Sequence, residues 1–221
     1  MVLYLGIVTL VVLFGCSPNS VLMDKQTKDS LSAIQEIRVL YYESPTPLVP
    51  LGGGAVVSGV LDVIATAAQT HRERLDNMGL VDPILHVKKG FLASMQTSLP
   101  RTTLSEVPRP LPDDDLENLK KELGQGYLLD FKTTKWGILN NAMQGYSFAV
   151  YHSRARLVNL SEEKIIWQGV CYLAENDPIA RPSIHDLEAD NGALFKAYLG
   201  KLATSCVAEL NRQFSDTGAS R

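Results

Sequence analysis

The sequence predicts an α/β (α+β) fold, in which helices flank a mixed sheet that has a three-stranded antiparallel part. Three consecutive runs rich in β-branched and aromatic residues support this prediction: "YLLDFKTTKWGI", "YSFAVYHSRARLVNL" and "KIIWQGVCYLA". The last two runs are separated only by Ser161, Glu162 and Glu163, a connection typical of a hairpin. The final run, "NGALFKAYLGKLATSCVAELNRQF", repeats apolar residues at helical spacing and predicts an amphipathic C-terminal helix.

The chain opens with a short apolar run, Met1 to Gly15, that leads into a cysteine. A secretory signal has an apolar core of about 7–15 residues, whereas a membrane span needs about 20. The last four residues, Leu13-Phe14-Gly15-Cys16, resemble the lipobox of bacterial lipoproteins, whose cysteine is acylated, with palmitate for example, and becomes the new N-terminus. Phe14 is bulkier than usual in a lipobox, and no Lys or Arg precedes the run. We expect lipidation at Cys16; the alternatives are an uncleaved anchor and a buried strand.

The lipobox resemblance also sets the expected organisation and address. Residues 1–15 form the signal peptide, residues 16–32 are polar with alternating charges and predict a flexible tether, and residues 33–221 form a single domain. Ser17 stands where Asp is the usual inner-membrane retention signal of enteric bacteria. By this resemblance, the lipid anchor lies in the inner leaflet of the outer membrane and the protein faces the periplasm.

The first half of the domain predicts a strand followed by helices. "IQEIRVLYYESP" reads as a strand, which prolines end. A glycine-rich turn then leads to a helix that is apolar on nearly every face from Ala55 to Ala68, interrupted by Asp62. This helix is either buried, packed against a copy of itself, or inserted in a membrane; a central carboxylate disfavours insertion. "VDPILHVKKGFLASMQTSLP" is a strand and a helix, or a single helix, and ends at Pro100.

The middle of the chain predicts an extended connection and a short helix. "TTLSEVPRPLP" is proline-rich, and "DDDLENLKKELGQG" places aspartates in a first helical turn and lysines later. The aspartates lack the spaced oxygen ligands of an EF-hand loop, so they indicate helix capping rather than a calcium site.

Cys171 and Cys206 are the two cysteines that remain after Cys16. Alternation on the strand puts Cys171 on the same face as Trp167, and the helical stripe puts Cys206 toward the body of the protein. An even pair in an oxidising periplasm predicts a disulfide, and two buried free thiols are the alternative.

The segment "WGILNNAMQGY" is a candidate recognition loop because it links two strand-like runs by a connection longer than a usual hairpin loop. Aromatic ends and central amides would supply anchoring area and adaptable hydrogen bonds. In the alternative interpretation, the two aromatic residues fill the core. The residues concerned are Trp136, Asn140, Asn141, Gln144 and Tyr146.

The order of elements, with "LKKELGQGYLLDF" and "RARLVNLSEEKIIWQG" as its most specific parts, resembles outer-membrane lipoproteins of the curli-secretion, Pel-export and penicillin-binding-protein-activator type. The resemblance covers roughly residues 33–214 in order of elements and implies a compact α/β body with flanking helices. The glycine-alanine helix departs from that pattern, so neither a channel nor a synthase-activating role is carried over.

Composition and motifs indicate no catalysis. The net charge of −3 shows no basic patch, which argues against nucleic acid as a partner. The four histidines, His71, His86, His152 and His185, lack metal-binding spacing, and no G-x-S-x-G elbow or cofactor motif is present. We therefore expect no cofactor, no metal, and a non-enzymatic binding or assembly role that uses an envelope protein or a second copy as partner. The alternative is a periplasmic hydrolase or transferase whose site is not visible in the sequence.

Overall fold

The computed structural model describes residues 20–48, 73, 77–141, 144–175 and 179–216 of the 221-residue chain. The helices within this part are α1 (Lys25–Leu31), α3 (Ile84–Ser98), α4 (Leu116–Leu123) and α5 (Ile184–Ser215). The strands are β1 (Glu36–Tyr41), β2 (Thr103–Glu106), β3 (Tyr127–Asn141), β4 (Tyr146–Asn159) and β5 (Lys164–Glu175). Cys16 and the predicted helix from Ala55 to Ala68 lie outside the described residues.

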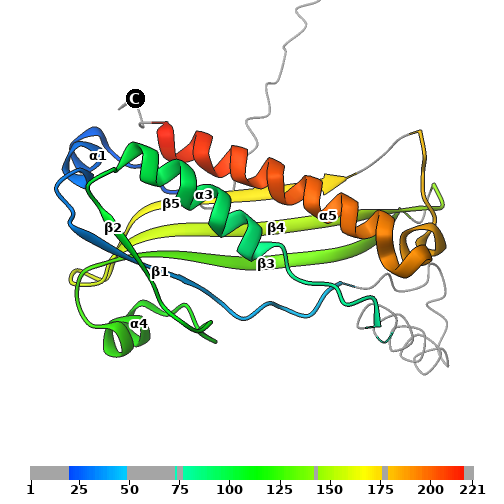
Figure 1. Cartoon of the computed structure of the whole chain (residues 1–221), viewed down its shortest axis with the longest axis horizontal. Coiled ribbons are helices and arrows are strands. Elements are labelled where there is room, and N and C mark those ends of the chain that lie inside the picture. The colour runs from blue at the N-terminus through cyan, green and yellow to red at the C-terminus, as the bar shows by residue number, and fades with distance from the viewer. Residues whose placement is uncertain (1–19, 49–72, 74–76, 142–143, 176–178, 217–221) are drawn as a thin grey trace, which may run out of the picture.

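The strands form one mixed sheet in the order β2-β1-β3-β4-β5. β1 is parallel to both of its neighbours, whereas β3, β4 and β5 are antiparallel to one another. The predicted α/β fold with a three-stranded antiparallel part is therefore confirmed. The long β3–β4 hairpin runs along the molecule, as Figure 1 shows.

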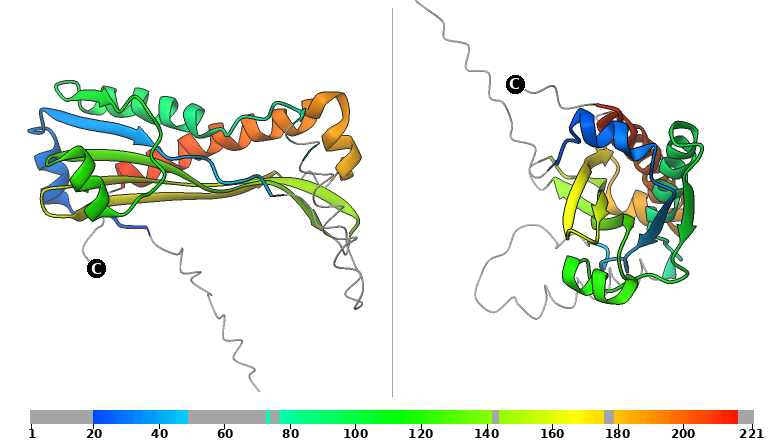
Figure 2. Two further views of the ribbon diagram at one scale, coloured as in Figure 1. Left: turned by 90° about the horizontal axis from the view of Figure 1, so that it is seen from below. Right: turned by 90° about the vertical axis from the view of Figure 1, so that its left-hand side faces the viewer.

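The larger hydrophobic core lies between the sheet and the two long helices, α3 and α5, which cover the same face (Figure 1, Figure 2). Three aromatic rings meet at its centre: Phe91 of α3 stacks on Trp167 of β5 with ring centroids 5.5 Å apart, and Phe214 of α5 packs edge-on against both. Apolar residues three or four apart on each helix produce these inward stripes. α5 is the C-terminal amphipathic helix that the sequence predicts.

A smaller core lies on the opposite face of the sheet, under α4. Alternate residues of a strand point to opposite faces, so Val39 joins the larger core while Leu40 joins the smaller one. The aspartate run ends in a helix cap, as expected: the side chain of Asp115 accepts a hydrogen bond from the Asn118 amide at 3.1 Å. "VDPILHVKKGFLASMQTSLP" forms a single helix, α3.

Part of the predicted flexible tether is folded, which corrects the boundary at residue 33. Val21 pairs with Gln168 of β5, and Asp24 caps α1 by accepting a hydrogen bond from the Thr27 amide at 2.7 Å. Met23 and Leu31 are buried in the larger core. Two apolar side chains and a good cap suffice to order a segment whose average composition is polar.

α5 begins earlier than expected and contains a break. A capping box formed by Ser183 and Asp186 starts the helix at Ile184, and the backbone leaves helical geometry from Ala189 to Gly192. Within the described residues, no helix is both long enough and apolar enough to span a membrane.

Candidate functional site

The predicted recognition loop is the end of a strand hairpin. The prediction of a connection longer than a usual hairpin loop is therefore wrong. β3 and β4 stay paired as far as Asn141 and Tyr146. Trp136 is buried and donates its indole N–H to the Pro45 carbonyl at 2.8 Å, and Tyr146 is also buried, as in the alternative interpretation. Sequence spacing missed this hairpin because a polar, amide-rich strand end resembles a loop.

The amides of the hairpin bond within it. Asn140 accepts a hydrogen bond from the Ser147 hydroxyl at 2.5 Å, and Asn141 donates to the Tyr146 hydroxyl at 3.2 Å. The backbone N–H of Gln144 donates to the Asn141 side-chain oxygen at 3.2 Å. These bonds leave the side-chain amides of Asn140 and Asn141 with fewer groups to offer a partner.

The two core cysteines are joined. The structure links Cys171 of β5 to Cys206 of α5 by a disulfide, with Cα atoms 5.6 Å apart. The Ser153 hydroxyl lies 3.3 and 3.1 Å from the two sulfur atoms and is buried with them. The pair thus ties the edge of the sheet to the helix that covers it.

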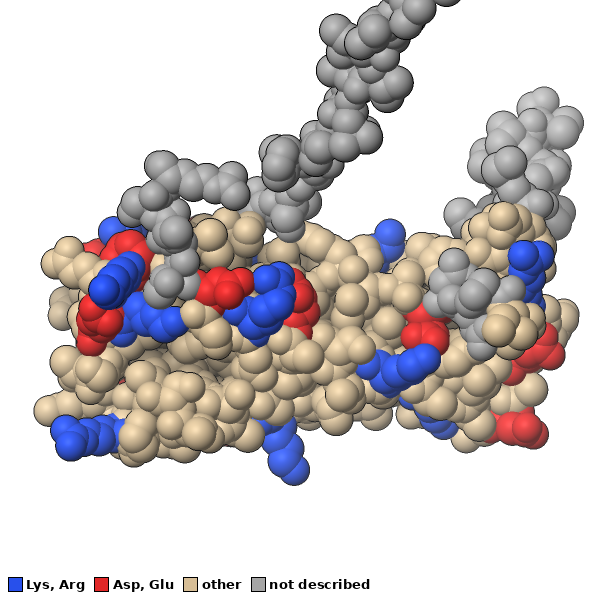
Figure 3. All heavy atoms as spheres, turned by 90° about the horizontal axis from the view of Figure 1, so that it is seen from above, with Lys and Arg blue, Asp and Glu red and all other residues tan. Residues whose placement is uncertain are grey.

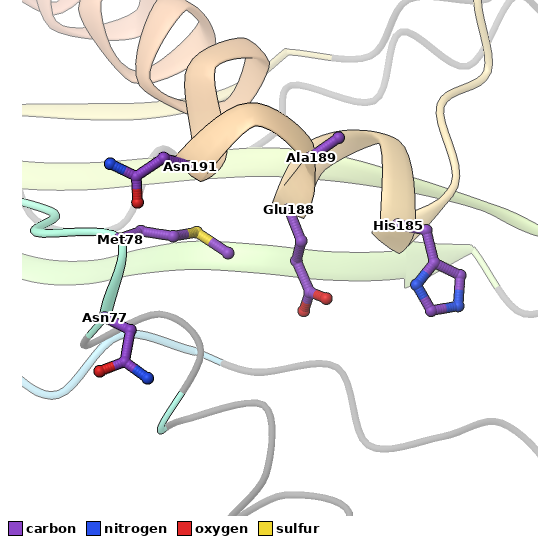
Figure 4. A pocket seen from close by; sticks show the side chains of 6 residues that line it. All are labelled: Asn77, Met78, His185, Glu188, Ala189 and Asn191. Atoms are coloured by element: carbon purple, nitrogen blue, oxygen red, sulfur yellow. The ribbon is translucent and has the colours of Figure 1, made fainter.

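The described cavities lie where residues 77–86 pack against the N-terminal half of α5, a contact that we call the α5 seam. The first cavity, of about 370 Å³, is lined by both sides of the seam. In Figure 4 the side chains of His185 and Glu188 point down from α5, Glu188 lies between His185 and Met78, and Asn77 lies on the opposite segment with Met78. Amide, imidazole and carboxylate groups around one thioether suit hydrogen bonding to a polar ligand.

The helix break shapes this first cavity. Asp190, Asn191 and Gly192 adopt left-handed backbone angles, with φ of 50°, 57° and 71°. The positive φ of Gly192 favours glycine, and a Cβ there would lie 2.7 Å from the Met78 sulfur, so the Met78 side chain would have to shift. The reversal places Asn191 and Glu188 on the rim of the same cavity.

The second cavity of the seam, about 390 Å³, is mainly apolar. Leu80, Leu199 and Ala203 line it, and two neighbouring apolar side chains are exposed to solvent, Val81 at 73% and Leu85 at 44%. Exposed large apolar residues beside an apolar hollow are typical of a protein or ligand contact.

Asp82 connects this cavity with the core. Its Oδ1 atom accepts hydrogen bonds from the Ile84 amide and the Thr133 hydroxyl, both at 2.8 Å, and the Tyr151 hydroxyl lies 3.2 Å from Thr133. Within the described part of the chain, its Oδ2 has no hydrogen-bond partner. Burial raises the pKa of Asp82, against the opposing effect of the hydrogen bond from Thr133.

A buried ionic cluster lies on the opposite face of the sheet, beside α4. Arg156 contacts Asp130, while Asp114 pairs with Lys132 at 2.7 Å and with Arg154 at 2.6 Å. Partial burial by itself would raise the pKa of Asp114. The hydrogen bonds from Lys132 and Arg154 outweigh that effect and lower the pKa to about 2. The contacts within this cluster hold the connection before α4 on the sheet, which is a structural role.

The histidines lie apart. His71 is outside the described residues, His86 lines the second cavity, and His185 lines the first. The ring of His152 packs edge-on against Tyr172 with centroids 4.9 Å apart. Among the residues that the structure describes, no group of three or more His, Cys, Asp or Glu side chains could hold a metal ion.

No protein-family model matches the chain, and no curated protein matches it significantly. Among solved structures, a PelC dodecamer from Paraburkholderia phytofirmans is 9% identical, with 81% of this chain and 88% of that chain covered and a TM-score of 0.36. The lipoprotein GNA1162 from Neisseria meningitidis is 16% identical, with coverages of 77% and 99% and a TM-score of 0.29. The C-terminal domain of LpoB from Escherichia coli is 17% identical, with coverages of 63% and 83% and a TM-score of 0.22. At TM-scores this low, the likenesses define neither a family nor a function for this chain.

Proposed function

We propose that the chain is a lipid-anchored component of the bacterial envelope that works by binding a partner rather than by catalysis. Cys16 carries the lipid, the anchor lies in the inner leaflet of the outer membrane, and the folded body faces the periplasm. The observation that carries the binding role is the apolar cavity of the α5 seam with Val81 and Leu85 exposed beside it.

The proposed address rests on two features of the chain. The lipobox-like residues before Cys16 supply a lipidation signal. The disulfide between Cys171 and Cys206 suits an oxidising compartment, where such bonds persist.

The proposed mode of action rests on how the described side chains are used. Two serine hydroxyls have structural contacts: Ser153 lies against the disulfide, and Ser183 caps α5. The Thr204 hydroxyl lies 3.5 Å from His86 on the surface and donates to the Gly200 carbonyl at 3.0 Å. The α5 seam, by contrast, offers an apolar hollow with polar groups at one end, which suits recognition.

The address is tested by labelling cells with palmitate and fractionating the membranes. Wild-type protein should take up the label and sediment with the outer membrane, whereas Cys16→Ala should take up none and leave that fraction. Unlabelled wild-type protein that retains Met1 would contradict the anchor.

The binding surface is tested by chemical crosslinking in intact cells, followed by identification of the crosslinked protein. Leu85→Ser combined with Val81→Ser should weaken the crosslinked product at least about tenfold, because hot-spot apolar contacts are worth roughly 2 kcal/mol or more. The matched control, Leu85→Met with Val81→Ile, keeps the surface apolar and should retain the product. Equal product from both variants would exclude the seam.

A further inference from the structure

β5 ends the sheet, and described residues cover only part of its outer edge. Figure 2, in its right-hand view, shows β5 at the margin of the sheet. Neighbouring residues of an antiparallel strand direct their backbone groups alternately to the two sides. The backbone N–H and C=O groups of Gln168 and Val170 point away from β4, because they bond to Val21 and to the Gln213 side chain. By the same alternation, the backbone groups of Tyr172 and Ala174 also point away from β4.

Two outward positions, Gln168 and Val170, are protected in different ways. Gln168 exchanges two backbone hydrogen bonds with Val21, both 3.0 Å long. At Val170, the Gln213 side chain of α5 imitates a neighbouring strand: its Oε1 accepts from the Val170 amide at 3.0 Å and its Nε2 donates to the Val170 carbonyl at 2.8 Å. Covering an edge in this way prevents another strand from pairing there.

The next two outward positions have no such cover within the described chain. The outward backbone groups of Tyr172 and Ala174 have no hydrogen-bond partner among residues 20–48, 73, 77–141, 144–175 and 179–216. Proline, lysine and a bulge are the usual protections of an edge, and all three are missing between Cys171 and Ala174. The following charge, Glu175, is paired with Lys201 of α5 at 2.5 Å.

The surface beside this open edge is apolar and ordered. Tyr172 is 48% exposed, and the edge-on contact with His152 fixes its ring. Val21 and Leu22, which lie along the covered part of the same edge, are exposed at 38% and 53%. Figure 3 looks onto the side of the molecule on which β5 lies and shows uncharged atoms between two clusters of charged side chains.

We infer that the open edge of β5, from Cys171 to Glu175, pairs with the same segment of a second copy of this chain. In an antiparallel arrangement about a two-fold axis at Leu173, Tyr172 lies opposite Ala174 of the second copy, and the reverse. Each of these pairs exchanges two backbone hydrogen bonds, so both open edges are satisfied at once. A large side chain then lies beside a small one on both sides of the axis.

The length of the open segment favours a second copy over a longer extended peptide. Within the described residues, two outward positions lie open beyond the Gln213 side chain, which blocks pairing at Val170, and the same segment on a second copy is open to the same extent. This contact goes beyond the α5 seam proposed above as a binding surface, and anchoring in one membrane leaflet, as proposed above, would concentrate the copies and favour a short contact.

Ala174→Pro tests the contact, with Ala174→Ser as matched control. Because the Ala174 amide points away from β4, proline removes an outward donor and leaves the β4–β5 ladder intact. Full-length lipidated protein carrying two different tags is coexpressed, extracted in mild detergent and retrieved by one tag. Wild type and Ala174→Ser should bring down the other copy, and Ala174→Pro should reduce it at least about tenfold.

Crosslinking tests the register independently of the proline variant. A short bismaleimide should join Tyr172→Cys on one tagged copy to Ala174→Cys on the other, and the join should disappear when Tyr172→Cys is paired with a Glu162→Cys copy. If Ala174→Pro melts well below wild type, Ala174→Lys, which places a charge on the same edge, replaces it.

Two results would overturn the inference: wild-type copies that never retrieve each other, or equal retrieval of Ala174→Pro and Ala174→Ser. A different protein lost from Ala174→Pro, with self-retrieval unchanged, would assign the edge to that protein instead. Palmitate labelling of the same samples separates the two proposals. Unlabelled wild type that still pairs through Ala174 would refute the address and leave the edge contact standing.

Discussion

Arg156 of β4 and Asp130 of β3 form a buried, hydrogen-bonded ion pair on the α4 face of the sheet. The guanidinium Nη2 lies 2.6 Å from Asp130 Oδ2, and Nε lies 3.0 Å from the same oxygen. The hydroxyl of Tyr42, the residue directly after β1, donates to the same oxygen at 2.8 Å. Arg156 also donates to the Asp114 carbonyl at 3.0 Å, so the pair connects the sheet with the chain before α4.

Asp130→Ala should destabilise the fold by about 3–5 kcal/mol, because it leaves the guanidinium of Arg156 buried without its main counter-charge. The double variant Asp130→Leu with Arg156→Met should recover most of that loss, since apolar residues of similar size often replace a buried pair without cost. Urea unfolding at pH 7 measures both. If the double variant is no more stable than Asp130→Ala, the pair stabilises the fold by more than neutralising the buried charge of Arg156.

Asp114 should make the protein sensitive to acid. Its folded pKa of about 2 is below the ordinary value of 3.8, so its stabilising effect is present above about pH 4 and is lost as the pH falls toward 2. Asp114→Asn should flatten the fall of the melting temperature over that window. Glu162→Gln removes the same charge on an exposed turn and is the matched control. If both variants follow the wild-type curve, Asp114 does not contribute to acid unfolding.

Asp82 should have the opposite effect on stability. Burial raises its folded pKa, so the folded state favours the protonated carboxyl, and stability falls as the pH rises from the unfolded value of about 3.8 through the folded one. Asp82→Asn keeps an acceptor for Ile84 and Thr133 and removes the charge. It should raise the melting temperature at pH 7 and change it little at pH 3. A lower melting temperature at pH 7 would show that the ionised form is needed in the fold.

Cys171 and Cys206 should be oxidised in the mature protein. A disulfide that closes a separation of 35 residues contributes about 3–4 kcal/mol in the chain-entropy model, so Cys171→Ala with Cys206→Ala should unfold at a lower urea concentration. Thiol alkylation of denatured, unreduced protein reads the bond directly. Two alkylated thiols per chain at these positions would show that the cysteines remain reduced.

The sequence predicts those helices and strands in which one face packs against the larger core, because the apolar residues on that face recur at regular spacing. The stripe from Phe195 to Leu210 identified α5 because one face of that helix packs on the sheet. The tether prediction is wrong for residues 20–32, because only two of these residues, Met23 and Leu31, are buried in the core, and average composition does not reveal so few contacts. The α5 seam was missed for another reason: its cavities depend on a helix break and on residues more than 100 positions apart, and spacing along one segment reports neither.

Gly192 and Gly200 should respond in opposite directions to the same substitution, although both lie in α5. Gly192→Ala places a Cβ 2.7 Å from the Met78 sulfur and forces alanine into a left-handed backbone, which alone costs about 1–2 kcal/mol. Gly200 has helical geometry and no atom within 4 Å of an added Cβ, so Gly200→Ala should stabilise by about 0.5–1 kcal/mol. Urea unfolding of the two variants beside wild type measures the difference. A stabilising Gly192→Ala would mean that α5 continues through Ala189–Gly192 without a break, and the first cavity of the seam would then lose the reversal that places Asn191 on its rim.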